Sequence, residues 1–278
     1  MAAPIKLFEE AAHASVYLKY RPRLPQKVFE RIVEYLKEKK SKPFKLAVDV
    51  GCGPGQSTRP LAPHFEKVIG VDVSDAQIEA AVKQTDNPPN VEYRTGQGET
   101  IPVPDNSVSL VTCCQAVHWF DYAAFCKDVD RVLLPSGCLA VCAYGNFVPE
   151  TCEGDLTKDK KMQQLHWNFY KGLMGAYWDD RRRHIDNVYA EFSIPYEGSI
   201  RDDSFQLVQE ITVPSYIGYI SSWSSMRAFL RKNPDSPNPL IGFQERLIEI
   251  LGAETQTEQT KVRLKAPIVV LLGRKPPP

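Results

Sequence analysis

Hydrophobic and polar residues alternate along the first half of the chain with two different periods. In residues 25–39, Val28, Ile32, Val33 and Leu36 recur every three or four positions between charges, which predicts an amphipathic helix. Short β-branched runs bounded by turn-forming residues predict strands at 46–50 and 67–73, and an apolar run predicts a buried strand at 107–117. Further strands are expected at 90–96 and 138–145.

Helical patterns separate these predicted strands. One helix is expected at 75–84, with Ser74 as its N-cap, and another at 121–137, ended by Pro135 and Gly137. Pro60 and Pro63 fall where a helix should connect the first two strands, so that helix is expected to be short or bent. Because parallel neighbours need crossover connections, the order predicts an α/β doubly wound domain with helices on both faces of a parallel sheet.

The pattern changes after residue 145. Residues 160–192 are helical and rich in aromatic side chains, and 215–233 and 242–251 are also helical, while 205–213 and 261–275 have strand character. The second half is therefore expected to form a helical cover around the last strands of the sheet.

Composition restricts the partners that the protein could have. The 34 basic residues balance the 34 acidic ones, so no global field attracts nucleic acid or an anionic membrane, and we expect a small-molecule partner. The longest apolar runs are too short to span a bilayer, and residues 1–25 lack the apolar core of a signal peptide, so a cytoplasmic protein is expected. The seven cysteines have no paired CxxC spacing, which favours reduced core thiols over disulfides or a zinc site.

A glycine-rich turn follows the first predicted strand. Gly51, Gly53 and Gly55 let a ligand approach the main chain, but they lack the GxGxxG spacing of dinucleotide folds and the Gly-Lys-Ser/Thr of a P-loop. Asp49 would repel phosphate and attract an ammonium group, and Asp72, ending the second strand, is placed to accept the hydroxyls of a ribose. A nucleoside with a cationic tail fits both carboxylates.

Four motifs in order extend this interpretation: "DVGCGPG" (49–55), the acidic end of "VIGVDVS" (68–74), "GQGETIPVPDNSVSLV" (96–111) and "RVLLPSG" (131–137). Together they resemble the class I S-adenosylmethionine-dependent methyltransferases, and "YRPRLP" (20–25) and "QAVHWFD" (115–121) resemble the trans-aconitate methyltransferase subgroup. The resemblance implies a Rossmann-like seven-stranded sheet, mostly parallel with an antiparallel last strand, and an inserted helical cap.

The expected domain organisation follows from the same resemblance. We expect a single methyltransferase domain over 1–278, with a cofactor-binding core at 25–145. Residues 146–260 would form a substrate-covering helical region with a late sheet strand, and 261–275 the final strand.

The resemblance also implies a set of cofactor-binding residues. Asp49 and the glycine backbone would hold the amino-acid end of S-adenosylmethionine, Asp72 the ribose, and Val73 the adenine. The segment 96–98 would reach the adenine amino group, although the family commonly has Asp where this chain has Gln97, whose amide oxygen can still accept that bond. The full expected set is Tyr20, Arg21, Asp49, Gly51, Cys52, Gly53, Gly55, Gln56, Ser57, Thr58, Asp72, Val73, Gly96, Gln97, Gly98, Gln115 and Ala116. No metal is expected, because methyl transfer needs alignment and exclusion of water.

The acceptor is less clearly indicated. By resemblance we expect O-methylation of a carboxylate, which is already ionised, whereas an amine or phenol would need a base. His118, just past the fourth strand, is the candidate base or a hydrogen-bond donor, with Trp119 beside it, although the two equally fit a core aromatic pair. The candidate substrate-binding residues are Tyr144, Trp167, Tyr170, Arg183 and Trp223. Aromatic residues at helical spacing more often pack helices together, and a charge run such as 179–184 is more often a solvated face.

The leading hypothesis is therefore a methyltransferase that converts S-adenosylmethionine to S-adenosylhomocysteine and acts on a small molecule. A non-catalytic module that binds the cofactor and regulates a partner protein is the alternative from another class. A nucleic-acid methyltransferase is disfavoured by the charge balance and the lack of a basic aromatic strip. The sequence leaves monomer and homodimer open.

Overall fold

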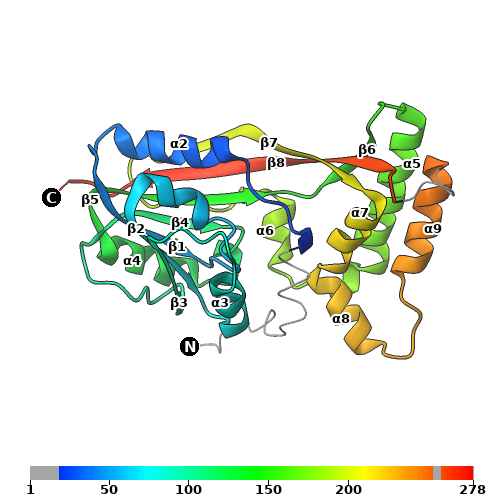
Figure 1. Cartoon of the computed structure of the whole chain (residues 1–278), viewed down its shortest axis with the longest axis horizontal. Coiled ribbons are helices and arrows are strands. Elements are labelled where there is room, and N and C mark those ends of the chain that lie inside the picture. The colour runs from blue at the N-terminus through cyan, green and yellow to red at the C-terminus, as the bar shows by residue number, and fades with distance from the viewer. Residues whose placement is uncertain (1–18, 253–257, 278) are drawn as a thin grey trace.

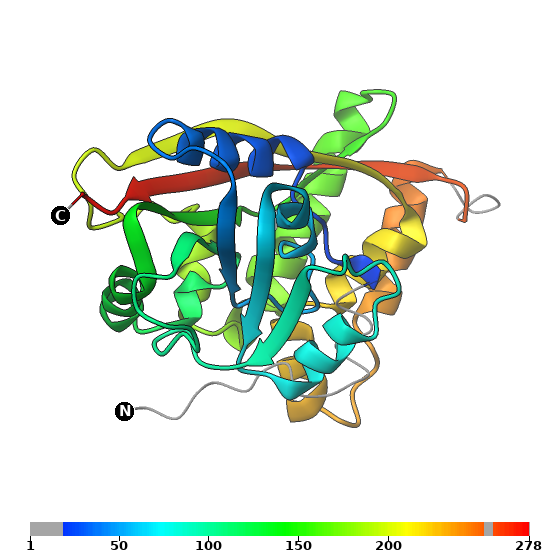
Figure 2. The ribbon, with the colours of Figure 1, turned by 60° about the vertical axis from the view of Figure 1, so that its left-hand side comes forward.

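A parallel sheet forms the first half of the computed structural model, which describes residues 19–252 and 258–277. Its strands run in the order β3-β2-β1-β4-β5 (Figures 1 and 2). They are β1 (Phe44–Val50), β2 (Phe65–Asp72), β3 (Val91–Thr95), β4 (Val108–Cys114) and β5 (Leu133–Tyr144). All five were predicted, and the predicted α/β class is confirmed.

The far edge of the sheet is antiparallel. The last strand, β8 (Lys261–Arg274), pairs antiparallel with β5 along its second half and with the short strand β6 (Val148–Thr151) along its first half. Strand β7 (Ile200–Thr212) pairs with β8 on the opposite side. The described part of the sheet thus has eight strands rather than the expected seven. The additional strand, β6, pairs with β8 on the same side of β8 as β5. Its four residues, one of them Pro149, gave no strand pattern.

Helices cover both faces of the parallel strands. Alternate strand residues point to opposite faces, so Ala47 and Leu110 pack with helix α2 (Gln26–Lys37), whereas Val48 and Val111 pack with α4 (Tyr122–Val132). Helix α3 (Asp75–Val82) begins at Ser74, whose hydroxyl accepts from the amide of Gln77, as the N-cap prediction requires.

The connection between β1 and β2 and the end of α4 were both predicted, with different outcomes. The connection between β1 and β2 is a short 3₁₀ helix, η1 (Arg59–His64), which agrees with the expectation from its prolines. The prediction of a helix continuing to residue 137 is wrong, because α4 ends at Val132 and β5 begins at once, with Leu133 paired to Val108. Ser136 takes a φ of 62°, a turn conformation that a helix does not allow.

The cap consists of more and shorter helices than its sequence pattern predicts. Residues 160–192 form four pieces: α5 (Leu156–Trp167), the π-helix η3 (Asn168–Leu173), the 3₁₀ helix η4 (Gly175–Tyr177) and α6 (Arg182–Asp186). The long helix expected at 215–233 divides into α7 (Val213–Ser221) and α8 (Ser224–Lys232), because Trp223 is extended. Helix α9 (Leu240–Leu251) follows, and Figure 1 shows β7 and β8 running from the core to this cap.

Within the described ranges, no helix is long and apolar enough to cross a membrane. The cysteines are all free thiols, and Cys114 and Cys152 are the two that are partly exposed. The expectation of a cytoplasmic protein depended partly on residues 1–25, and most of these lie outside the described residues.

Candidate functional site

A cavity opens at the carboxyl ends of β1, β2 and β4, where ligands bind in open α/β sheets. Its empty space, including the open mouth, is about 1120 Å³. The lining residues come from the glycine turn, from the ends of β2, β4 and β5, and from the segments that follow β3 and β4. Others come from the segment before α2 and from the first turns of α2 and α3. The full set is Pro22, Arg23, Leu24, Phe29, Gly51, Cys52, Gly53, Pro54, Gln56, Ser57, Asp72, Val73, Gln77, Gly96, Gly98, Cys114, Gln115, Ala116, Trp119, Phe120 and Tyr144.

The glycine turn presents main chain to this cavity. The amides of Gly51 and Cys52 both donate to the carbonyl of Val71, which fixes the turn against β2. Gly51 has a φ of +70°, and a Cβ added there would lie 2.4 Å from the Cβ of Ala116. Glycine is therefore required at Gly51 by both conformation and space.

Two carboxylates lie beside the turn without a cationic partner in the described chain. Asp49 is fully buried and accepts from the hydroxyls of Ser57, Thr58 and Thr112, each at 2.7 Å. Asp72 accepts from the amides of Gly53 at 2.8 Å and Ser74 at 2.9 Å. Burial raises the pKa of each carboxyl, and the hydrogen bonds act in the opposite direction. Two such carboxylates favour a ligand that carries positive charge.

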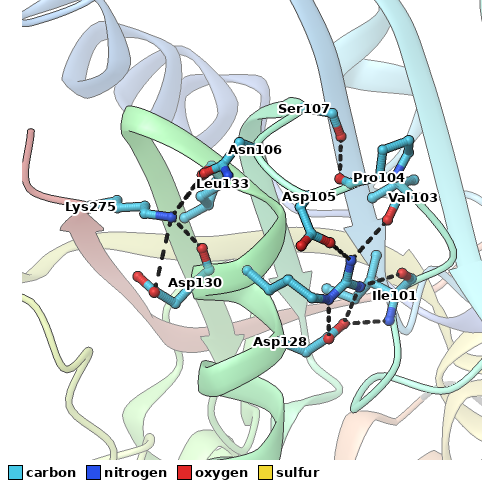
Figure 3. A network of polar contacts seen from close by, with 11 residues as sticks. Ile101, Val103, Pro104, Asp105, Asn106, Ser107, Asp128, Asp130, Leu133 and Lys275 are labelled. Carbon is cyan, nitrogen blue, oxygen red and sulfur yellow. Dashed lines mark hydrogen bonds and ion pairs between the residues drawn. The ribbon is translucent and has the colours of Figure 1, made fainter. Parts of the chain in front are cut away.

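A clamped loop forms the opposite wall. Gly96 and Gly98 line the cavity, and Gly98 packs against the ring of Phe120. The same loop continues to residues 101–105, which Arg131 of α4 holds. Figure 3 shows Ile101, Val103 and Asp105 of this loop close to Asp128 of α4. All five N–H donors of Arg131 are used, on both oxygens of Asp128, the carbonyls of Ile101 and Val103, and Asp105. Asp128 also accepts from the amide of Ile101 at 2.6 Å.

This clamp gives a testable prediction. Lysine at position 131 would keep the charge but lose the planar fork, so Arg131→Lys should raise the dissociation constant for S-adenosylhomocysteine about tenfold by loosening the loop. Arg263→Lys is the matched control, because Arg263 pairs with Glu210 at 2.7 Å on the antiparallel edge of the sheet. Equal calorimetric affinities of the two variants would contradict this role for Arg131.

The end of β4 closes the inner part of the cavity. Gln115 has a φ of 58°, and its side chain bridges to β5, accepting from the amide of Tyr144 at 2.9 Å and donating to its carbonyl at 3.1 Å. This bridge fixes Gln115, Ala116 and Tyr144 as one rigid wall.

Most residues of the expected cofactor set lie on the cavity wall. Those brought together there are Gly51, Cys52, Gly53, Gln56, Ser57, Asp72, Val73, Gly96, Gly98, Gln115 and Ala116. Trp119 and Tyr144, from the expected catalytic and substrate sets, also line the cavity.

The remaining expected cofactor residues lie off the wall, for different reasons. Asp49 and Thr58 are fully buried behind the turn, where they hydrogen-bond each other. Gly55 is also buried and lies against the Tyr93 ring, so a side chain there would collide with it. Gln97 is exposed and forms a bridge with Thr100.

Tyr20 and Arg21, the last two residues of the expected cofactor set, lie toward the cap. The ring of Tyr20 packs against Gly218 of α7. Arg21 donates to the carbonyl of Ser222 at 3.0 Å and lies over the ring of Tyr219.

His118 is placed differently from the expectation of a base. Its side chain is 7% exposed, does not line the cavity, and is 2.6 Å from the hydroxyl of Tyr189. Burial, reinforced by Arg182, His184 and Arg181, lowers the pKa of His118 to about 3. His118 is thus a neutral buried imidazole that supports Trp119, whose ring is 4.8 Å away.

The other candidate substrate residues lie in the packing of the cap. Tyr170 and Trp223 are buried, and their rings pack edge to face 5.4 Å apart, with Trp167 against Tyr170 at 5.6 Å. Arg183 is exposed, while its neighbour Arg182 points inward and donates to the hydroxyl of Tyr170 at 2.8 Å. The helix-packing interpretation therefore describes these aromatic residues, since they fill the space between α5, α7 and α8.

Several lining residues were not predicted. Leu24 precedes α2, and Phe29 lies in its first turn. Phe120 follows Trp119, and Gln77 lies in the first turn of α3. Arg23 is exposed at the cavity. The "YRPRLP" motif was a signal for Arg23, but neither Phe29 nor Gln77 differs in sequence from an ordinary helix residue.

Comparisons with known proteins agree with this geometry. A methyltransferase domain model matches residues 48–141. A Dictyostelium discoideum protein named as a methyltransferase is 32% identical over 260 residues, covering 93% of this chain and 92% of the relative. A Saccharomyces cerevisiae protein named as an S-adenosylmethionine-dependent methyltransferase is 25% identical, covering 91% and 92%.

The likeness extends to a solved structure. An Anaeromyxobacter dehalogenans protein described as a type II methyltransferase superposes with a TM-score of 0.73 at 27% identity, over 93% of this chain and 100% of that one. Fold, cavity position and relatives lead to one conclusion. The chain belongs to the class I S-adenosylmethionine-dependent methyltransferases.

Proposed function

We propose that the protein transfers the methyl group of S-adenosylmethionine to a carboxylate oxygen of a small-molecule acceptor. The observation that carries the choice of acceptor is the make-up of the cavity wall. In the described chain the wall has no histidine, lysine or glutamate, and its one carboxylate, Asp72, is held by backbone amides. A carboxylate needs no proton removed before it attacks, whereas an amine or phenol does.

The thiols on the wall do not supply a base. Burial raises the pKa of Cys52 well above its usual range. The pKa of Cys114 is also raised well above its usual range, first by a hydrogen bond with Cys142 and then by burial. Both thiols therefore stay protonated at neutral pH and do not accept a proton from an acceptor.

Cations near Trp119 favour an anionic acceptor. The guanidinium of Arg181 lies 5.6 Å from the centre of the Trp119 ring. The charges of Arg182 and Arg181 also help to lower the pKa of the neighbouring His118. Arg23 adds a third positive charge at the cavity. Asp179 lies 3.4 Å from Arg181 and Asp186 lies 3.7 Å from Arg182, so the charges of these two arginines are partly offset. The guanidinium groups still favour a carboxylate over an ammonium group as their ligand.

The chain's own residues would bind and orient the cofactor, which supplies an electrophilic methyl group when bound. Asp72 would hold the ribose. Asp49 lies behind the turn, and its negative charge would favour the positively charged amino-acid end of the cofactor. The rigid wall of Gln115, Ala116 and Tyr144 would direct the acceptor and exclude water.

The experiment uses S-adenosylmethionine with a tritiated methyl group and a small-molecule extract. A carboxyl methyl ester hydrolyses in mild base and releases volatile labelled methanol, so we expect base-labile label in small organic products. Label that stays bound after base treatment would instead indicate N- or phenol O-methylation and would overturn the proposed acceptor. Absence of label from all products would favour the non-catalytic alternative.

The same assay tests the role of His118. His118→Gln removes the imidazole but keeps a polar group for Tyr189, so turnover is expected to fall less than about fivefold; an essential base would cost about a hundredfold or more. Turnover is measured from pH 6 to 8, because loss of a base would also change the pH profile. A hundredfold loss in a folded variant would restore His118 as the base.

A further inference from the structure

The segment of residues 20–24 connects the cavity to the cap. Its second part lines the cavity, with Pro22, Arg23 and Leu24. Its first part, Tyr20 and Arg21, lies instead against α7 of the cap. The cavity wall and α7 therefore share one short segment of chain.

Gly218 makes room for the ring of Tyr20. A Cβ built on Gly218 would lie 2.5 Å from Cζ of Tyr20, and the three nearest atoms all belong to that ring. Gly218 is buried within α7, where alanine would be the better helix former. The glycine thus costs helix stability, but it lets the ring lie directly on the backbone of α7.

Arg21 continues this connection from α7 to the glycine turn. Its guanidinium donates to the carbonyl of Ser222, the C-cap residue of α7, at 3.0 Å. Its own carbonyl accepts from Nε2 of Gln56, which lines the cavity, at 3.4 Å. Because Arg21 is bonded on both sides, a displacement of the neighbouring Tyr20 would be transmitted to the cavity wall.

We propose that Gly218 and Tyr20 are positioning residues for ligand binding, because their contact holds the 20–24 segment against the cavity. Neither residue lines the cavity, so both act through that segment. This inference rests on the proposed use of S-adenosylmethionine. By linkage, a ligand that fixes the segment also favours its contact with α7, so binding in the cavity stabilises the cap.

Gly218→Ala tests this contact, since the added methyl group would occupy the space of the Tyr20 ring. The dissociation constant for S-adenosylhomocysteine, measured by calorimetry, should rise about tenfold, as for the loss of one ordinary contact. Tyr20→Ala removes the ring and should give the same rise. The double variant should show no further rise, whereas two independent effects would multiply to about a hundredfold.

Gly242→Ala is the matched control. Gly242 also lies in a helix of the cap, α9, but a Cβ added there would have nothing within 4 Å, and the residue does not line the cavity. Its affinity for S-adenosylhomocysteine should equal that of the wild type.

Trypsin provides a readout that a merely structural role would not change. Arg23 is exposed, and its bond to Leu24 lies at the cavity. Saturating S-adenosylhomocysteine should slow cleavage of this bond in the wild type and in Gly242→Ala. Gly218→Ala and Tyr20→Ala should lose most of this protection at saturation, because the segment is no longer held.

The inference is overturned if Gly218→Ala binds as tightly as the wild type, if the single effects multiply in the double variant, or if protection from trypsin is unchanged. Should Gly218→Ala fail to fold, Tyr20→Ala carries both measurements, because Tyr20 is partly exposed, and wild-type results for it would overturn the inference. A wild type that does not bind S-adenosylhomocysteine would contradict the proposed function itself, which keeps the two failures distinct.

Discussion

Gly51→Ala is expected to lower the free energy of unfolding by about 2–5 kcal/mol and to abolish cofactor binding. The left-handed φ of +70° costs an alanine about 1–2 kcal/mol, and the clash with Ala116 costs about 1–3 kcal/mol as overpacking. Ala116 has little freedom to move, because the neighbouring Gln115 is fixed to β5. The shift must therefore fall on the glycine turn. Urea unfolding and calorimetry with S-adenosylhomocysteine measure the two effects.

Gly242→Ala is the matched control for this substitution. Gly242 lies within α9, and a Cβ added there would have nothing within 4 Å. Alanine is the better helix former by about 1 kcal/mol, so this variant should be as stable as the wild type or more stable, with unchanged affinity. A Gly51→Ala variant that matched Gly242→Ala in both measurements would contradict the steric account of the turn.

Stability is expected to fall as the pH is lowered below about 6.5, because two buried histidines are neutral in the folded protein. His118 and His166 are 7% and 1% exposed, and each lies 2.6 Å from a tyrosine hydroxyl. Burial, with Arg182 in second place, lowers the pKa of His166 to about 3, as it does for His118.

The sign follows from the direction of these shifts. A depressed folded-state pKa means that the unfolded chain binds more protons between pH 6.5 and 3, so the stabilisation is complete above pH 6.5 and lost on acidification. Each histidine contributes up to about 1.4 kcal/mol per pH unit.

Urea unfolding at pH 7 and pH 5 measures this loss, and His166→Gln serves as the variant with one fewer titrating group. We expect its stability to depend less steeply on pH than that of the wild type. Equal slopes would show that His166 is not a neutral buried group.

The core was predictable because its elements have strong local signals. Strands β1 and β2 are β-branched runs bounded by breakers, β4 is an apolar run, and Ser74 caps α3 as its residue type predicts. The glycines and Asp72 could be assigned to a cavity because their positions relative to the strands fix where they lie.

The cap was less predictable because its breaks depend on tertiary packing. Trp223 is extended and interrupts a helical pattern, since its ring packs against Tyr170, Tyr219 and Trp178. His118 follows the fourth strand as expected, but only the fold shows that Tyr189, 71 residues later, buries it. Gln77 could not be assigned to the cavity from the sequence, because nothing in the sequence shows which face of α3 lines the cavity.

The most direct test of the whole account is isothermal titration of the purified, folded protein with S-adenosylhomocysteine. We predict saturable binding with one site per chain, lost in Asp72→Ala. Absence of any binding heat over a range of temperatures, from protein with a cooperative unfolding transition, would contradict the assignment of this cavity to the cofactor.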